Sequence, residues 1–371
     1  MKNKKKILIL GGGLYQIKGI RDALNQNLEV YTVDNRKRNI GHKISNHYIN
    51  EDLKNKENIL KIYLKLDIDF YLTFASDIGL QTCAFMEKNL IKQNLNFIFS
   101  DKKELREIQE KLELPRPNYL ISNQFFDKNN DIFKSKYVLK PLDSSGSKGV
   151  KIFEKYNYPS NNDIDSALQY SDLNEVIFEN YIFGEEYGGD CYILDGEIVD
   201  INITKKVLSG TEVIGHIINP NINSVIVRDL KKQLSTVSSY KNYFNGPINY
   251  DFKILNNRVI FIEFSFRTGG NGITHLIEST KHLSYETLLI NQITKKDDID
   301  LSRVKIENKK FGSLNIKTNS IDKFLELSEE KIITKEWNYS NNYNDDVSTL
   351  TIFEISNEKD FFKMKKILEK I

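Results

Sequence analysis

One stretch decides how this chain is interpreted: Tyr137-Val138-Leu139-Lys140-Pro141-Leu142-Asp143-Ser144-Ser145-Gly146-Ser147-Lys148-Gly149-Val150. An apolar strand reaches Lys140, Pro141 stops it, and a loop of small residues follows before the next strand begins. Backbone N–H groups of serine and glycine can approach an anion closely, and Lys140 adds a positive charge beside them. The stretch therefore predicts a loop that covers a triphosphate. The alternative is a surface hairpin with a polar turn.

The composition predicts a globular protein of two or three domains. The chain has 371 residues, of which 40% are hydrophobic and 28% charged, and its net charge is +2. The charges are mixed along the sequence, so nucleic acid is not an expected partner. Cys83 and Cys191 lie in apolar segments, which predicts no disulfide framework and fits a reducing cytoplasm. The apolar run 7–10 is too short for a signal sequence or a membrane span, so no membrane association is expected.

The first hundred residues alternate predicted strands and helices. The strands are expected at 7–10, 28–34, 70–74 and 96–99, and the helices at 16–25, 57–64 and 78–89. This βαβα order predicts a doubly wound parallel sheet. A helix at 102–112 follows, and Pro115-Arg116-Pro117 then marks a domain boundary, with the helix free to pack on either side of it. Beyond it, Asp195-Gly196 between apolar runs predicts a tight hairpin.

The glycine run Gly11-Gly12-Gly13 follows the first strand, and Asp34 ends the second. A dinucleotide-binding fingerprint would need a third glycine where this chain has Gln16. The favoured interpretation is a tight turn that could border a substrate.

Two acidic residues are predicted to face each other on a hairpin at 248–264. If Phe252 and Ile254 share an apolar face with Ile262 and Ile260 respectively, the turn has three residues and Asp251 lies opposite Glu263. The Cβ atoms of such a pair are about 5 Å apart, so the carboxylates repel each other unless a cation joins them. A hard divalent ion such as Mg²⁺ suits two carboxylates and phosphate oxygens. The alternative is a pair of solvated carboxylates with Lys253 nearby.

Taken together, these segments resemble the ATP-grasp superfamily over about residues 95–300. Asp101-Lys102 matches the pair that opens the helix before the lid, and Phe178-Glu179-Asn180-Tyr181-Ile182 resembles the hinge that reads adenine. Gly184-Glu185-Glu186-Tyr187 resembles a Gly-x-Glu-Tyr motif whose glutamate binds ribose. That role falls to Glu186 by spacing, with Glu185 as the alternative.

The resemblance implies a set of site residues. ATP is expected to contact Lys102, Lys140, Ser144, Ser145, Gly146, Ser147, Lys148, Gly149, Glu179, Tyr181, Ile182 and Glu186. Mg²⁺ or Mn²⁺ is expected on Asp251, Glu263 and Ser265, where the serine replaces the family's usual asparagine and weakens a second metal site. Arg267 and Lys140 are the expected catalytic residues. The substrate is expected near His216, Arg267, Gly269, Gly270 and Asn271, although an isolated histidine such as His216 is more often structural.

The resemblance also implies a fold and an activity. The expected fold is a parallel α/β domain at 1–100, a two-lobed ATP-grasp domain with antiparallel sheets at 101–300 (lid at about 115–183), and a small C-terminal α/β subdomain at 301–371. The implied activity is ATP-dependent ligation of a small-molecule carboxylate to an amine through an acyl phosphate, by a cytoplasmic enzyme that could be a homodimer. Three alternatives remain: a carboxylase-type enzyme that uses bicarbonate, an ATP-binding regulatory protein without catalysis, and an NAD-dependent dehydrogenase.

Overall fold

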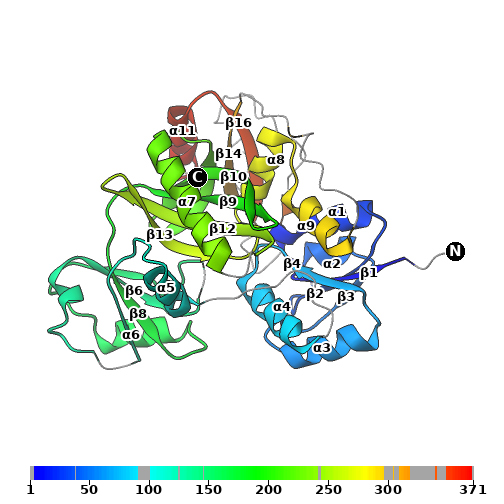
Figure 1. Cartoon of the computed structure of the whole chain (residues 1–371), viewed down its shortest axis with the longest axis horizontal. Coiled ribbons are helices and arrows are strands. Elements are labelled where there is room, and N and C mark those ends of the chain that lie inside the picture. Colours follow the sequence, from blue (N-terminus) through cyan, green and yellow to red (C-terminus); the bar gives the residue numbers. More distant parts are fainter. Residues whose placement is uncertain are drawn as a thin grey trace.

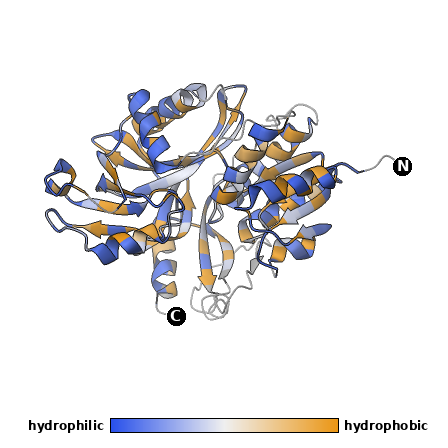
Figure 2. Cartoon of the chain, turned by 90° about the horizontal axis from the view of Figure 1, so that it is seen from below, coloured by the Kyte–Doolittle hydropathy of each residue, from blue (hydrophilic) through white to orange (hydrophobic). Residues whose placement is uncertain are grey.

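The computed structural model describes residues 4–37, 39–90, 101–123, 126–144, 146–240, 244–295, 304, 309–317, 339–340 and 348–369. Within them lie one parallel sheet and two antiparallel sheets (Figure 1). Along helices and strands, hydrophobic and hydrophilic residues alternate (Figure 2), as expected of elements with one buried face. No helix among the described residues is long and apolar enough to cross a membrane.

The N-terminal sheet is parallel, with strand order β3-β2-β1-β4, as the alternating pattern predicts. Its strands are β1 (Lys6–Leu10), β2 (Glu29–Val33), β3 (His47–Ile49) and β4 (Phe70–Thr73). Its helices are η1 (Leu14–Gln16), α1 (Ile17–Asn25), α2 (Ile40–Ile44), α3 (Lys56–Lys65) and α4 (Asp77–Asn89). The edge strand β3 was not predicted, because two of its three residues are exposed and give no apolar pattern. The strand expected at 96–99 lies outside the described residues.

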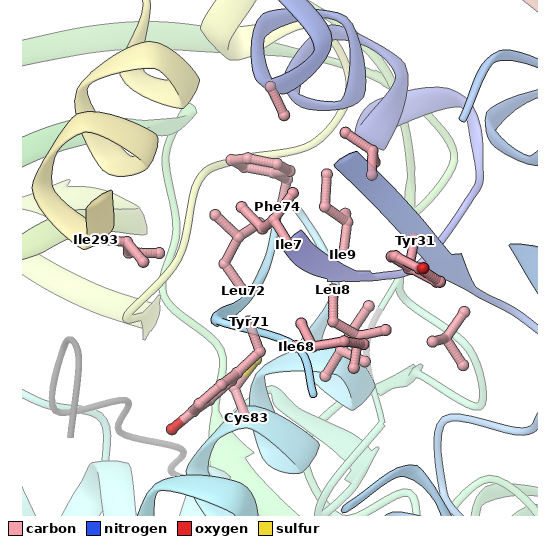
Figure 3. Close-up of a cluster of buried hydrophobic side chains, with 14 of the residues drawn as sticks. Ile7, Leu8, Ile9, Tyr31, Ile68, Tyr71, Leu72, Phe74, Cys83 and Ile293 are labelled. Carbon is pink, nitrogen blue, oxygen red and sulfur yellow. The ribbon is translucent and has the colours of Figure 1, made fainter. Parts of the chain in front are cut away.

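The core of this sheet is completed by a helix from much later in the chain. Ile293 belongs to α9 (Tyr285–Thr294) and packs with Leu72 and Phe74 in the cluster shown in Figure 3. Leu289 and Ile290 of the same helix join the same buried cluster. The N-terminal sheet and the rest of the molecule therefore share buried apolar surface, which holds them in a defined arrangement.

The N-terminal glycine run forms a turn that a side chain fills. Gly13 N donates to Gln16 Oε1 (2.9 Å), and Gln16 Nε2 donates to Phe74 O (2.6 Å). Gly11 has a φ of +107°, a conformation that favours glycine. Gln16 thus occupies the space next to Gly11 and Gly13, which agrees with the interpretation of this run as a turn.

The second sheet is antiparallel, with order β5-β8-β6-β7, and forms a separate lobe at the lower left of Figure 1. Its elements are β5 (Tyr119–Ser122), η2 (Asp131–Lys134), β6 (Tyr137–Pro141), β7 (Lys151–Phe153), α6 (Asn161–Leu168) and β8 (Val176–Asn180). Aromatic rings fill its small core, with Tyr137 stacked on Phe153 at 5.3 Å and Phe133 edge-on to Phe178 at 5.5 Å. We call this lobe the lid.

The central sheet is antiparallel, with order β13-β12-β9-β10-β11-β14-β16-β15. Its strands are β9 (Glu186–Leu194), β10 (Glu197–Ser209), β11 (Glu212–Ile218), β12 (Gly246–Leu255), β13 (Arg258–Ser265), β14 (Lys310–Lys317), β15 (Tyr339–Ser340) and β16 (Ser348–Ile355). Its helices are α5 (Lys102–Lys111), α7 (Ser224–Tyr240), α8 (Ile273–Lys281), α9 and α11 (Glu358–Leu368). Helix α5 packs on this sheet through Leu105 and Ile108, and β14 and β16 extend the sheet beyond β11.

The predicted hairpins are present, but one register differs from the prediction. Leu194 pairs with Glu197 around Asp195-Gly196, as predicted. In the β12–β13 hairpin, Asp251 lies opposite Glu263 as expected.

The predicted three-residue turn and its pairs in the β12–β13 hairpin are wrong. Phe252 pairs with Phe261 and Ile254 with Val259, while Leu255 pairs with Arg258. Asn256 and Asn257 both have positive φ (51° and 58°), which asparagine tolerates and which closes a two-residue turn. The register then shifts between Asp251 and Phe252. This shift restores the Asp251–Glu263 pair and leaves Ile262 outside the apolar core, on the cavity side.

Candidate active site

A cavity of about 690 Å³ lies between the lid, the central sheet and the N-terminal sheet. The predicted site residues that line it are Lys102, Lys140, Ser144, Gly146, Ser147, Lys148, Glu179, Tyr181, Ile182, Glu186, His216, Asp251, Glu263, Arg267, Gly270 and Asn271. Three predicted residues lie beside it. Gly149 packs against Pro141, Gly269 lies over Asp190, and Ser265 lines a small adjoining pocket with Lys102 and Glu263. Ser145 lies outside the described residues.

Two lysines beside the cavity, Lys102 at the start of α5 and Lys148 in the loop after β6, form no ion pair with another described residue. Lys102 begins α5, where the Asp101 side chain caps the helix by accepting from Glu104 N (2.9 Å). The Lys102 ammonium donates to Ser144 O in the predicted phosphate loop. In the part of the chain that the structure describes, neither Lys102 nor Lys148 forms an ion pair. These two charges are therefore available to an anionic ligand.

Lys140 takes part in a buried charge network that the sequence did not reveal. Its ammonium donates to Glu179 Oε2 (2.6 Å), and Arg106 Nε donates to Glu179 Oε1 (2.6 Å). Burial alone would raise the pKa of Glu179, but the two cations lower it to about 2. Arg106 also donates to Ile262 O (2.8 Å). It thereby ties the lid strand β8 to the central sheet through α5.

The predicted hinge borders the cavity on its apolar side. Lys253 donates to Ile182 O (3.0 Å), and its ammonium lies 4.6 Å from the centre of the Tyr181 ring. Val138 and Ile152 from the lid and Ile262 from the central sheet line the same cavity. Apolar groups from two lobes that face one space can hold a flat ring between them. Ile262 has this position only because of the register shift in β13.

Acidic residues gather around one buried lysine on the central sheet. Lys206 Nζ lies 3.0 Å from Glu186 Oε1 and 2.5 Å from Asp251 Oδ2. Burial, with Glu186 and Glu263 nearby, raises the pKa of Asp251 to about 6, although Lys206 opposes that rise. Glu185 pairs instead with Lys205 and accepts from Tyr187 Oη (2.8 Å). Of the two glutamates in the motif, Glu186 is the one that shares the Lys206 ammonium with Asp251.

The carboxylates of Asp251 and Glu263 fit a divalent cation whose remaining coordination positions are filled by oxygen atoms of a bound phosphate compound. The two carboxylates are cross-strand partners, and burial, with Glu186 and Glu263 nearby, raises the pKa of Asp251 even though Lys206 pairs with it. A bound cation would favour the ionised form of this carboxyl. Among the described residues, no group of three or more His, Cys, Asp or Glu residues could by itself hold a metal ion. Phosphate oxygens would have to complete the coordination. Ser265 Oγ donates to Asp77 Oδ1 (3.1 Å), which turns it towards the N-terminal sheet.

Arg267 is held by Asp77 of helix α4, which packs against the N-terminal sheet. Its Nε donates to Asp77 Oδ1 (2.7 Å) and its Nη2 to Asp77 Oδ2 (2.8 Å), a bidentate pair. Asp77 is the first residue of α4, where the Ser76 side chain caps the helix by accepting from Gly79 N. Burial would raise the pKa of Asp77, but Arg267 and Ser265 lower it overall. The orientation of Arg267 therefore depends on how α4, beside the N-terminal sheet, packs against the end of β13 in the central sheet.

The glycine-rich loop after Arg267 rests on a buried carboxylate. Gly269 N donates to Asp190 Oδ2 (2.8 Å), and Asn249 Nδ2 donates to Asp190 Oδ1 (2.8 Å). A Cβ at Gly269 would lie 2.7 Å from Asp190 Oδ1, so a side chain there would displace the loop. Despite the two donors, burial raises the pKa of Asp190 to about 7.

Asp190 should make the stability of the protein depend on pH. Its pKa is about 7 when folded and near 3.8 when unfolded, so the folded state binds the extra proton between these values. Stability contributed by the neutral carboxyl is thus lost as pH rises from about 4 to 7, by on the order of 4 kcal/mol. We therefore expect the unfolding free energy of the wild type to fall, relative to that of Asp190→Asn, as the pH rises through this range. Urea unfolding of both proteins at pH 5 and 8 measures it, and a pH-independent difference would contradict the assignment.

Three segments far apart in the chain meet beside this loop. Tyr15 Oη donates to Asn271 Oδ1 (2.6 Å), and Asn315 Nδ2 donates to the same oxygen (3.1 Å). Below them, His216 N donates to Ser313 Oγ (3.1 Å), which donates to Asn271 O (2.8 Å). The loop is therefore fixed from both sides.

His216 is buried and lines the cavity. Its Nδ1 shares a hydrogen with Thr204 Oγ1 (2.9 Å). Burial, with Lys206 nearby, lowers the pKa of His216 to about 3. The imidazole is neutral near pH 7, so it can donate one hydrogen bond and accept another. A group with so low a pKa is not an effective base.

Sequence reasoning missed Arg106, Asp77, Lys206 and Asp190. One signal was available for Arg106, because it falls beside Leu105 on the apolar side of an amphipathic helix. Another was available for Lys206, because strand alternation puts it on the polar face with Thr204 and Asn202. Asp77 had no such signal, since an acidic residue in a first helical turn is common.

Comparison with known proteins identifies a family for one segment of the chain and relatives for its fold. Residues 133–275 match the sequence model of the ATP-grasp domain family. A comparison with curated proteins found no match. Among solved structures, the N5-carboxyaminoimidazole synthetase of Staphylococcus aureus in complex with ADP has a TM-score of 0.76 at 14% identity, covering 98% of each chain. The L-amino acid ligase of Bacillus licheniformis has a TM-score of 0.73 at 13% identity, covering 99% of this chain and 98% of the ligase.

A carboxylase domain has the same fold. The biotin carboxylase domain of the Hydrogenobacter thermophilus 2-oxoglutarate carboxylase, in complex with MgADP, ADP and bicarbonate, has a TM-score of 0.71 at 13% identity. The alignment covers 100% of this chain and 90% of that chain. Such low identities establish the fold and leave the reaction open. Residues 133–275 therefore match the ATP-grasp domain family, and the chain as a whole has the fold of these solved structures.

Proposed function

We propose that this protein is an ATP-dependent ligase that joins a carboxylate to an amine. The observation that carries the proposal is that Lys102, Lys140 and Arg267 line one cavity with the paired carboxylates of Asp251 and Glu263. Phosphoryl transfer requires positioning and charge neutralisation more than covalent help from the protein, and this set provides both. Solved structures of this fold include an L-amino acid ligase and complexes with ADP and MgADP.

In the proposed reaction, a carboxylate oxygen of the first substrate attacks the γ-phosphorus of ATP, and ADP leaves. The amine nitrogen of the second substrate then attacks the acyl carbon, a proton is lost from nitrogen, and inorganic phosphate leaves. Lys102, Lys140 and Arg267 neutralise the phosphate charge in this proposal. A Mg²⁺ ion held by Asp251 and Glu263 would add further neutralisation at the phosphates.

The lid has a protective role in the proposed reaction. An acyl phosphate that meets water is hydrolysed, so the site must exclude water while the intermediate exists. The lid, proposed as residues 115–183, carries Lys148 and the small-residue loop over the cavity. We propose that it closes between the N-terminal domain (1–100) and the rest of the ATP-grasp domain (101–300), with residues 301–371 as the C-terminal part.

The test is MgATP-dependent phosphate release with pairs drawn from amino acids, other carboxylates and amines, together with a bicarbonate arm. We expect release only when a carboxylate and an amine are both present, and none from Lys140→Ala. Phosphate release that requires bicarbonate in place of an organic acid would favour a carboxylase-type reaction instead. That reaction is the second candidate because a biotin carboxylase domain has the same fold. Binding of ADP without phosphate release under any condition would favour a regulatory protein. The orientation of Ser265 towards Asp77 also supports that alternative.

A further inference from the structure

A short segment at 181–184, which we call the hinge connection, leads from the lid strand β8 towards β9 of the central sheet. Hydrogen bonds between described residues hold it from two sides. Tyr181 N donates to Lys136 O (2.9 Å) in the lid, and Lys253 Nζ of β12 donates to Ile182 O (3.0 Å). Lys253 is therefore the residue through which the central sheet fixes the hinge connection.

Strand alternation and register bring Lys253 to this place. The preceding residue, Phe252, is fully buried and stacks on Tyr187 at 5.5 Å on the core face of the sheet. Lys253 therefore lies on the opposite face with Asp251, and both line the cavity. Lys253 is also the cross-strand partner of Glu186, the first residue of β9. The register thus sets Lys253 beside the point where the hinge connection enters the central sheet.

The Lys253 ammonium is buried among three partners. The residue is only 7% exposed. Its Nζ lies 3.0 Å from Ile182 O, 4.6 Å from the centre of the Tyr181 ring and 4.0 Å from Glu186 Oε2. Burying an ammonium is unfavourable unless polar groups or an aromatic face replace the lost water. Two of the three partners belong to the hinge connection, so the contacts that offset the burial also hold this segment in place.

The ion pair with Glu186 is the weakest of these contacts. Lys206 Nζ lies 3.0 Å from Glu186 Oε1, nearer than Lys253 Nζ is to Oε2. A loss of the Lys253 charge would therefore leave Glu186 with its closer cation. What Lys253 supplies and Lys206 does not is the hydrogen bond to Ile182 O. A substitution of Lys253 thus acts mainly on the hinge connection.

The hinge connection offers one backbone donor. Ile182 N–H forms no hydrogen bond with another described residue, whereas the carbonyl of the same residue is bound by Lys253. Ile182 lines the cavity. A backbone N–H matches a ring nitrogen that accepts a hydrogen bond, such as N1 of adenine, and opposes one that carries a hydrogen, such as N1 of hypoxanthine. This discrimination requires that the orientation of the backbone at Ile182 is fixed.

We infer that Lys253 is a positioning residue that fixes the hinge connection and thereby sets the preference of the site for an adenine base. Lys253 acts through the backbone of Ile182 and the ring of Tyr181. The inference rests on the ATP binding of the proposed function and adds a residue that determines its base specificity.

Calorimetry of MgADP and MgIDP, the hypoxanthine analogue, with the full-length protein tests the inference without requiring turnover. We expect the wild type to bind MgADP at least about tenfold more tightly than MgIDP. Lys253→Met keeps the apolar stem but loses the donor, so this preference should fall to within about twofold. The ratio of the two affinities is insensitive to the lost charge, because both nucleotides carry the same phosphates.

Two further variants separate positioning from a general effect on the fold. Lys253→Arg retains a charged donor and should keep most of the preference for MgADP. Lys232 is exposed on α7, outside the cavity lining, so Lys232→Met removes the same charge elsewhere and should leave both affinities unchanged. Chemical denaturation of each variant shows that it is folded.

The possible results separate this inference from the ligase proposal. Equal affinities of the wild type for the two nucleotides, or an unchanged ratio in Lys253→Met even where both affinities fall, would overturn the inference and leave the ligase reaction to be judged by phosphate release. If the base preference depends on Lys253 but no pair of carboxylate and amine releases phosphate, the ligase proposal fails and the role of Lys253 remains. A wild type that does not bind MgADP would overturn both.

Discussion

Replacing Glu263 with glutamine is expected to lower the rate of MgATP-dependent phosphate release by about 10²–10³-fold. Glu263 is the cross-strand partner of Asp251, and the pair is the proposed ligand set for Mg²⁺. Glutamine keeps the size of the side chain but removes the charge that binds a hard cation. The loss of one preorganised electrostatic contact to a transferring phosphoryl group has an effect of this size.

A binding measurement distinguishes a lost metal site from a misfolded protein. Calorimetry of ADP with and without Mg²⁺ should show tighter binding with the metal in the wild type, and that enhancement should fall or disappear in Glu263→Gln. Glu354 offers a matched control, because it lies on β16 of the same sheet and pairs with Lys309 at 2.9 Å on the surface. Glu354→Gln should release phosphate at the wild-type rate. An unchanged response of Glu263→Gln to Mg²⁺ would remove this residue from the metal site.

Replacing Arg106 with methionine is expected to lower the free energy of unfolding by about 3–5 kcal/mol. Arg106 is fully buried and donates to Glu179, to the Gln109 side chain and to two carbonyl groups of β13. Methionine fills part of the space but leaves Glu179 buried with Lys140 as its remaining cation. Because burial penalises the ionised carboxyl, the pKa of Glu179 should rise well above its present value near 2.

Chemical denaturation followed by circular dichroism measures this loss. Arg116 provides the control, since it pairs with Glu110 at 2.7 Å near the surface, and Arg116→Met should change stability by less than about 1 kcal/mol. The double variant Arg106→Met with Glu179→Gln should recover part of the stability, because the uncompensated charge is gone. A double variant no more stable than Arg106→Met would show that the lost packing and carbonyl contacts dominate over the ion pair.

Local sequence patterns predicted most of the architecture. The βαβα order gave the parallel sheet correctly, since strand and helix periods can be identified in short segments. Within the run from 137 to 150, residues 137–141 form strand β6, and the described loop residues 144 and 146–148 line the cavity. Asp251 pairs with Glu263 as predicted. The register leading to that pair was predicted wrongly, because it depends on Asn256 and Asn257 both adopting positive φ, which residue pattern alone did not indicate.

The sequence by itself determined which residue types stand at which motif positions: the lid lysines, the paired acids on one hairpin, and the glycine-rich loop after Arg267. Tertiary structure decided their partners. Asp77 is 190 residues from Arg267 and Tyr15 is 300 residues from Asn315, yet each pair is in hydrogen-bond contact. Periodicity reports which face of its own strand or helix a side chain occupies, whereas the choice of a partner depends on how separate sheets pack. Whether a charge in this cavity is neutralised or left for a ligand is therefore decided by packing.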